Sequence, residues 1–140
     1  MRSPRFAFGF VVSFLLLCAC SGVTEEWQAA SAAKDYYDCL VEGNTTGFLE
    51  GKAGIDDLPD AYAEQLLKAV EQYQADMQQK HGGLREVRIV DNHYLNDHQD
   101  MYRDTTLHYI YAYLLLCYGD STQEEITVPM VKQDDDWRMK

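Results

Sequence analysis

Three polar side chains in the second half of the chain are suited to acid–base chemistry: Asp91, His93 and His108. In an extended strand, Asp91 and His93 share a face with Val87 and Ile89, because alternate residues point to the same side. His108 is expected on the same face of the following strand. A carboxylate beside imidazoles can act as general base and acid. These residues are the catalytic candidates, and the alternative is a polar rim where the sheet extends past its covering helices.

Acidic and histidine residues also gather in two expected turns. His93, Asp97, His98 and Asp100 lie close in sequence, but a five-residue spacing across a turn matches no known metal site, and a solvated turn is predicted. Asp134, Asp135 and Asp136 lack the alternation and glycine of a calcium loop and predict a charged hairpin tip. The sequence therefore predicts no metal and no cofactor.

The first residues have the layout of an export signal. Arg2 and Arg5 precede a short apolar segment, residues 6–17, that is too short to span a bilayer. The sequence Leu17-Cys18-Ala19-Cys20 resembles a bacterial lipobox, which implies removal of residues 1–19 and acylation of Cys20. Residues 20–24 would then be a short tether. The expected location is the bacterial cell envelope, as an outer-membrane lipoprotein facing the periplasm or the cell surface; the alternative is an ordinary cleaved signal.

Composition limits the possible partners. The 140 residues carry a net charge of −11, with 12 basic and 23 acidic side chains. An acidic chain repels phosphate backbones, so nucleic-acid binding is disfavoured. Residues 25–140 are long enough for one domain. The membrane is expected as a partner only through the lipid on Cys20.

The segment from Thr105 to Tyr118 is the most strand-like part of the chain. Its even-numbered residues, including Ile110, Leu114 and Leu116, form an aliphatic face that we expect to meet the helices. Its odd-numbered residues form a second, tyrosine-rich face, and tyrosine is enriched at interfaces. The predicted interface residues are Leu107, Tyr109, Tyr111, Tyr113 and Leu115. The alternative is that tyrosine is simply a good strand residue.

Periodicity predicts the remaining elements. Helices are expected over 25–42 and 59–81, and strands over 84–95, 105–118, 122–132 and 137–139. The expected antiparallel pairs are Ile89 with His108, Val87 with Ile110, Leu114 with Ile126, Ala112 with Val128, and Met130 with Trp137. Pro129 predicts a bulge or an exposed segment in the third strand. The fold class is therefore α+β, with two N-terminal helices packed on one face of a curved four-stranded antiparallel meander.

This element order, ending in the acidic turn and strand DDDWRM, resembles the nuclear-transport-factor-two-like, cystatin-like cone. With the lipobox, it resembles more closely the small bacterial lipoproteins of the lumazine-binding-like group. The resemblance implies a curved sheet wrapped on helices, in some members with a pocket at the wide end, and frequent dimers. It implies no particular activity, because this fold supports enzymes, binders and scaffolds.

The sequence supports three functional hypotheses. The first is a lipid-anchored, non-enzymatic binding or interaction module that forms a homodimer or docks a partner protein through the tyrosine face. The second is a binder of small apolar ligands in the cone interior, near Tyr37, Tyr73, Ile110, Leu114 and Trp137. The third is an acid/base enzyme that uses Asp91 or His108.

Two cysteines remain after the signal, Cys39 and Cys117. An exported protein can form a disulfide. However, Cys39 is expected on a helix inside the sheet and Cys117 on the outer face, so two free thiols are predicted.

Overall fold

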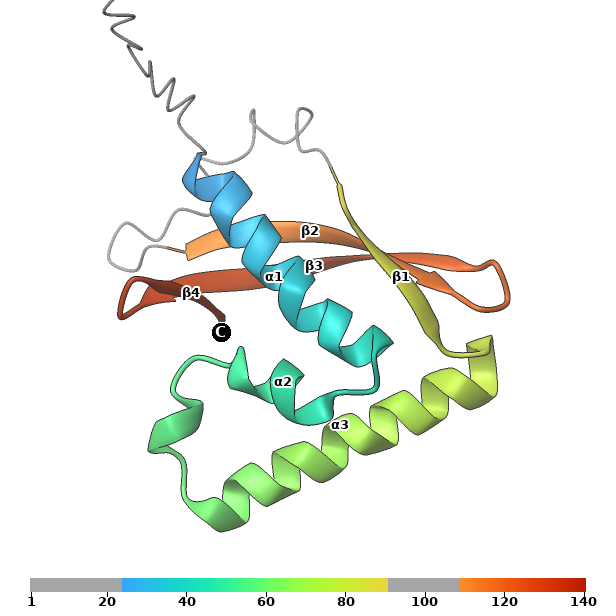
Figure 1. The fold of residues 1–140 in the computed structure, drawn as a ribbon, viewed down its shortest axis with the longest axis horizontal. Helices are drawn as coiled ribbons and strands as arrows, with labels where there is room; N and C mark the ends of the chain where they lie inside the picture. Colours follow the sequence, from blue (N-terminus) through green and yellow to red (C-terminus); the bar gives the residue numbers. More distant parts are fainter. Residues whose placement is uncertain (1–23, 91–108) are drawn as a thin grey trace, which may run out of the picture.

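The computed structural model describes residues 24–90 and 109–140, in which helices precede a curled four-stranded antiparallel sheet of order β1-β2-β3-β4 (Figure 1). This confirms the predicted α+β meander. The elements are α1 (Glu25–Val41), α2 (Thr45–Glu50), the 3-10 helix η1 (Ile55–Asp57), α3 (Asp60–His81), β1 (Leu84–Ile89), β2 (Tyr109–Tyr118), β3 (Gln123–Gln133) and β4 (Asp136–Met139).

Helix α1 is the element that covers the sheet (Figure 1). It begins where the Thr24 side chain accepts a hydrogen bond from the Trp27 backbone N–H at 3.2 Å. Ala29, Ala30 and Ala33 are buried, and their small side chains let the helix backbone approach the strands closely. Trp27 is 54% exposed because it lies in the first turn of the helix, ahead of these buried alanines.

Strand β2 confirms the predicted division into two faces. Ala112, Leu114 and Leu116 are at most 1% exposed, whereas the odd-numbered residues between them stay partly accessible. Because side chains alternate along a strand, one face of β2 packs under α1 and the other points away from it.

The pairing of β2 with β3 was predicted correctly, but the first hairpin was not. Leu114 pairs with Ile126 and Ala112 with Val128, as expected. Ile89 pairs with Leu114 rather than His108, and Val87 with Leu116 rather than Ile110. The shift is even-numbered, so both residues keep the predicted face.

The start of β1 sets this register. The Gly119 N–H donates to the Gly83 carbonyl at 2.9 Å, which places Leu84 beside Tyr118. A bulge between Leu84 and Glu86 then adjusts the strand. Contacts of the β2–β3 turn with Gly83 therefore fix the pairing of β1.

The last hairpin is tighter than predicted. Met130 pairs with Met139, and Trp137 pairs with Lys132, two residues away from the predicted Met130–Trp137 pair. Asp134 and Asp135 both have positive φ, +50° and +64°, which is the geometry of a two-residue hairpin turn that matches strand twist. The acidic segment is thus a hairpin tip, as expected.

Pro129 lies in an unbroken ladder opposite Tyr111, so β3 has no bulge there. Its carbonyl accepts from the Lys140 N–H at 2.9 Å, so its backbone faces the β4 side of the strand. The N–H that proline lacks is therefore not needed by β2. The predicted bulge is wrong, and Pro129 is only partly exposed.

The stretch after α1, expected to be a loop, contains α2 and η1. The Asn44 side chain begins α2 by accepting from the Gly47 N–H at 2.9 Å. Beyond α2, the chain forms a parallel bridge between Lys52 and Met139, with bonds from Ala53 N–H to the Met139 carbonyl and from Met139 N–H to the Gly51 carbonyl, each 2.7 Å. This segment therefore extends the sheet beyond β4.

Helix α3 departs from the expected packing. It runs below the sheet in Figure 1, and no residue within it is buried. Its predicted apolar stripe leaves Tyr62 50% and Tyr73 39% exposed. Among the described helices, α1 covers most of the inner face, while Phe48 of α2 and Met77 of α3 pack against the same core. Helix α3 leaves part of that face open.

Candidate functional site

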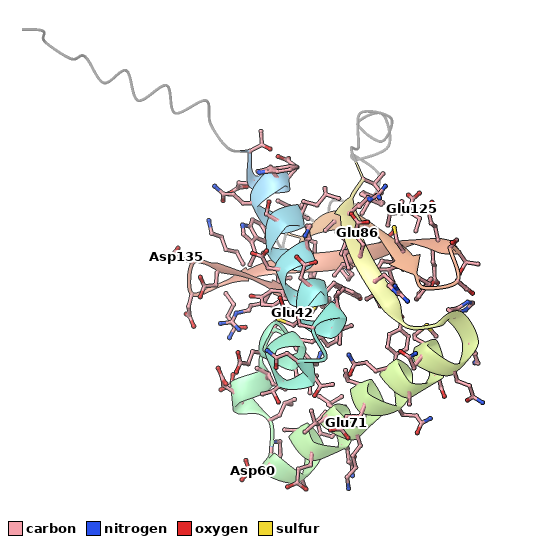
Figure 2. All side chains as sticks on the ribbon, turned by 45° about the vertical axis from the view of Figure 1, so that its right-hand side comes forward. Glu42, Asp60, Glu71, Glu86, Glu125 and Asp135 are labelled. Carbon is pink, nitrogen blue, oxygen red and sulfur yellow. The ribbon has the colours of Figure 1, made fainter. Side chains whose placement is uncertain are left out.

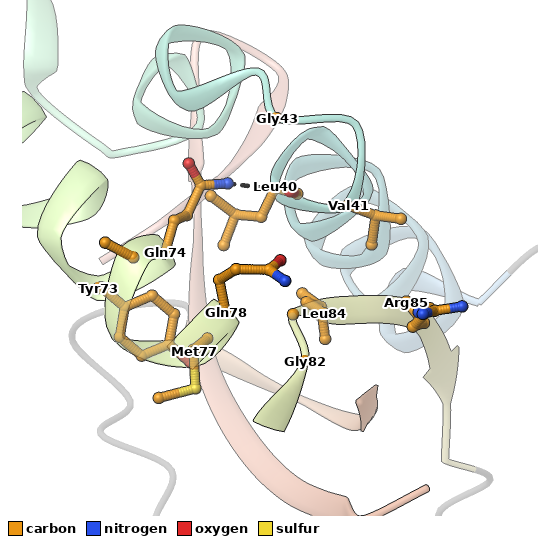
Figure 3. A pocket seen from close by; sticks show the side chains of 12 residues that line it. Leu40, Val41, Gly43, Tyr73, Gln74, Met77, Gln78, Gly82, Leu84 and Arg85 are labelled. Carbon is orange, nitrogen blue, oxygen red and sulfur yellow. Dashed lines mark hydrogen bonds between the residues drawn. The ribbon is translucent and has the colours of Figure 1, made fainter. Parts of the chain in front are cut away.

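The open region between α3, the end of α1 and the start of β1 is a cavity of about 620 Å³. Figure 3 shows Tyr73, Met77 and Gln78 of α3 on one side, Leu40 and Val41 of α1 on another, and Leu84 at the base of β1. The Gln74 amide donates to the Leu40 carbonyl at 2.9 Å and ties α3 to α1 across the opening. The lining thus combines an apolar surface with a few amide groups and the Arg85 side chain, as in many small-molecule sites.

Beside this cavity, three tyrosines and a glutamate come together from four elements. The Tyr118 hydroxyl donates to Oε2 of Glu124 at 2.7 Å. Burial raises the pKa of Tyr118, and the bonds with Glu124 and Tyr73 raise it further. Burial, with Tyr73 and Glu124 nearby, raises the pKa of Tyr37 to about 12. Tyr37 and Tyr118 therefore keep their hydroxyl protons at neutral pH and act as hydrogen-bond donors.

The residues predicted to line an inner site divide into two groups. Leu114 is fully buried and Trp137 is 7% exposed, both within the core under α1, and Ile110 packs against that core. Tyr73 lines the 620 Å³ cavity, and Tyr37 lines a smaller one of about 250 Å³ with Phe48 and Val128. The accessible part of the interior is thus formed by the tyrosines rather than by the strand aliphatics.

A cluster that the sequence did not suggest lies at the end of α3. Nδ1 of His81 is 3.0 Å from Oδ2 of Asp120, and the Thr122 hydroxyl donates to Oδ1 of Asp120 at 2.5 Å. The hydroxyl and backbone bonds from Thr122, with His81 nearby, lower the pKa of Asp120 to about 2. The His81 ring lies 4.9 Å from that of Tyr118. The cluster fastens the end of α3 to the β2–β3 turn.

The outer face of the sheet carries the predicted tyrosine stripe. Tyr111 is 37% exposed, Tyr109 and Tyr113 are half-buried, and Leu115 shares their face. The Lys140 ammonium lies 4.5 Å from the centre of the Tyr109 ring. Cys117 lies on this face and Cys39 on α1, and both are free thiols, as predicted.

Several predicted residues lie outside the described part of the chain. They are Cys20, Asp91, His93, Leu107 and His108. Within residues 24–90 and 109–140, no group of three or more metal-binding side chains converges. No helix in the same ranges is long and apolar enough to cross a membrane.

Charged side chains cover the part of the molecule that the structure describes, and the basic residues there form no patch. Figure 2 shows labelled carboxylates on helices, strands and turns alike: Glu42, Asp60, Glu71, Glu86, Glu125 and Asp135. The basic residues are dispersed among them, as in the pairs of Lys34 with Asp38 and of Arg88 with Glu86.

No protein-family model and no curated protein matches the sequence. A solved structure from Campylobacter jejuni, described as a proposed NTF2-like transpeptidase, matches the fold with a TM-score of 0.53. The match covers 78% of this chain and 94% of that one, at 13% sequence identity. The chain has an NTF2-like fold. At this identity the NTF2-like match shows the fold alone, so the resemblance to lumazine-binding-like lipoproteins stays a prediction.

Proposed function

We propose that the chain is a lipid-anchored, non-enzymatic binding module that takes a small molecule into the opening between α3 and the sheet. One observation carries this proposal: a 22-residue amphipathic helix has no buried residue and borders a 620 Å³ cavity. Leaving apolar surface in water costs roughly 25 cal/mol per Å², so a ligand that covers this surface gains affinity.

The cavity has the size and lining that such a ligand needs. Its volume falls within the range of roughly 300–1,000 Å³ that is usual for small-molecule sites. Met77 and Leu84 offer apolar contacts, and Gln78 offers a polar group that can orient the ligand. The NTF2-like fold is compatible with this use, because in this chain it leaves a cavity between α3, the end of α1 and the start of β1.

Titration with the neutral apolar dye N-phenyl-1-naphthylamine tests the proposal. We expect saturable enhancement of fluorescence by the purified protein. Ala75 lines the cavity, so Ala75→Trp should fill it and weaken dye binding about tenfold or more. Ala61→Trp, at an exposed position near the start of the same helix, should bind like the parent. Absence of saturable binding, or equal effects of the two variants, would overturn the proposal.

The membrane anchor is part of the proposal. Leu17, Ala19 and Cys20 fit a lipobox, and α1 begins at Glu25, so lipid on Cys20 would hold the domain close to the bilayer of the bacterial envelope. Metabolic labelling with a radioactive fatty acid tests this. Cys20→Ser should abolish the label and Cys18→Ser should retain it; label that survives Cys20→Ser would overturn the anchor.

A second candidate function is self-association through the tyrosine face. The observation in its favour is that α1 covers the opposite face, while Tyr111 stays 37% exposed between two other tyrosines (Figure 1). The enzymatic alternative depends on Asp91, His93 and His108, which lie outside the described residues, so no geometry supports it.

A further inference from the structure

Glu124 is an exposed carboxylate on the face of the sheet that the helices should cover. It pairs across the ladder with Leu116, which is 1% exposed, so by strand alternation its side chain leaves the sheet on the inner side. It nevertheless remains exposed. The inner face thus presents a negative charge where α3 fails to seal it.

No basic side chain of the described residues neutralises Glu124. Its hydrogen bond comes from the neutral hydroxyl of Tyr118, at 2.7 Å to Oε2. His81 stacks near the Tyr118 ring, but its Nδ1 is engaged with Asp120. A carboxylate that lacks a cation is a group to which a ligand can supply the positive charge.

Tyrosines from three elements lie near this carboxylate, and the Tyr118 hydroxyl is bonded to it. Tyr118 interacts with both Glu124 and Tyr73, and Tyr37 interacts with Tyr73 and Glu124. The face of an aromatic ring attracts a cation, and the attraction grows when water is excluded. Tyr73 also lines the 620 Å³ cavity, so one residue joins the cluster to the space for a ligand body.

We infer that the ligand of the inner site is a small organic cation, an amine or quaternary ammonium with an apolar body, whose charged head is held by Glu124 and the rings of Tyr37 and Tyr73. The inference rests on the proposed binding function and names its ligand class. The net charge of −11 also attracts cations toward the protein.

Arg85 is a positively charged side chain that lines the cavity at the β1 end, and it would favour a ligand of the opposite charge. Glu124 lies on β3 and Arg85 on β1, with β2 between them. If Arg85 governed selection, the ligand would be an anion with the same apolar body. The sign of the preferred head group therefore decides between the two residues.

Isothermal titration calorimetry with three probes that share a phenylbutyl body tests the inference. The probes are 4-phenylbutyltrimethylammonium, 4-phenyl-1-butanol and 4-phenylbutyrate. We expect the cation to bind about tenfold more tightly than the alcohol, and the carboxylate to bind more weakly than either. Glu124→Gln should reduce cation affinity to that of the alcohol and leave alcohol affinity unchanged.

Glu125→Gln is the matched control, because it removes the adjacent carboxylate, which points to the outer face. It should preserve the preference for the cation, and both variants should keep the parent's thermal unfolding midpoint. If the naphthylamine dye binds but the three probes bind equally, or the carboxylate binds most tightly, the cation inference is overturned and the binding function stands. If neither the dye nor any probe binds, both fail.

Discussion

The Tyr36 hydroxyl donates a hydrogen bond to the backbone carbonyl of Trp137 at 2.8 Å. It links α1 to β4, the last strand, across 101 positions of sequence. We expect Tyr36→Phe to lower the free energy of unfolding by about 1 kcal/mol, because a partly buried carbonyl loses its donor. Urea denaturation would measure this. Tyr62→Phe, at a 50% exposed position, should leave the midpoint unchanged.

The two faces of β2 should differ sharply in their tolerance of truncation. Leu114 is fully buried under α1, so Leu114→Ala should cost about 2–5 kcal/mol of unfolding free energy through lost burial and a cavity. Leu115, the next residue, points outward and is partly exposed. Leu115→Ala should cost less than about 1 kcal/mol in the same denaturation experiment. Equal costs at the two positions would contradict the assignment of faces.

Gly119 permits the close approach of the β2–β3 turn to the end of α3. A Cβ atom at this position would lie 2.5 Å from the Gly82 carbonyl oxygen, which is backbone and cannot rotate away. Gly119→Ala should therefore destabilise the protein by about 1–3 kcal/mol, as other overpacked substitutions do. Thermal unfolding followed by circular dichroism would test this, and an unchanged midpoint would show that the turn and helix can separate freely.

Asp120 should titrate far below an ordinary aspartate. Its pKa is lowered to about 2 by hydrogen bonds from Thr122 and by His81, so its contribution to stability is present above about pH 3.8 and is lost as pH falls toward 2. A carboxyl-carbon NMR titration should give a midpoint near 2. Thr122→Val removes the hydroxyl donor and should raise that midpoint, whereas Thr127→Val, on the outer face, should not.

Self-association through the tyrosine face should respond to a charge at its centre. Tyr111→Lys places an ammonium in an apolar contact and should weaken the dimer. The dimer dissociation constant measured by sedimentation equilibrium should rise about tenfold or more. Because each copy carries a charge of −11, added salt should favour the dimer of the parent protein. Tyr62→Lys on α3 is the matched control. A parent that is monomeric at every concentration would remove this candidate function.

Much of the fold was accessible from sequence because local chemistry and global packing agree. Periodicity predicted a helix over 25–42, and the observed α1 ends one residue before the predicted end, Glu42. Alternation along 105–118 predicted which side of β2 is buried. The acidic segment before Trp137 predicted a turn, which the structure places at Asp134 and Asp135.

The features that sequence did not reveal depend on contacts between distant segments. The register of β1 follows from the bond between Gly119 and Gly83, and periodicity cannot distinguish registers that differ by an even number of residues. The apolar side chains at helical spacing on α3 indicated a buried helix. How far α3 packs on the sheet depends instead on where the end of this helix is attached to the β2–β3 turn. The pairing of Tyr118 with Glu124 was equally invisible, because Glu124 reads as an ordinary solvent-facing acid.

Pro129 also bears on whether strands of other copies can add to the exposed edge of β3. The backbone polar groups of Pro129 face the β4 side of the strand. By alternation, those of Thr127 and Glu125 face the same side, and no described strand pairs with them there. Such an unpaired edge is a template on which further strands can add into fibrils. Proline, which has no N–H to donate on that side, and the glutamate charge both discourage the addition of a further strand along this edge.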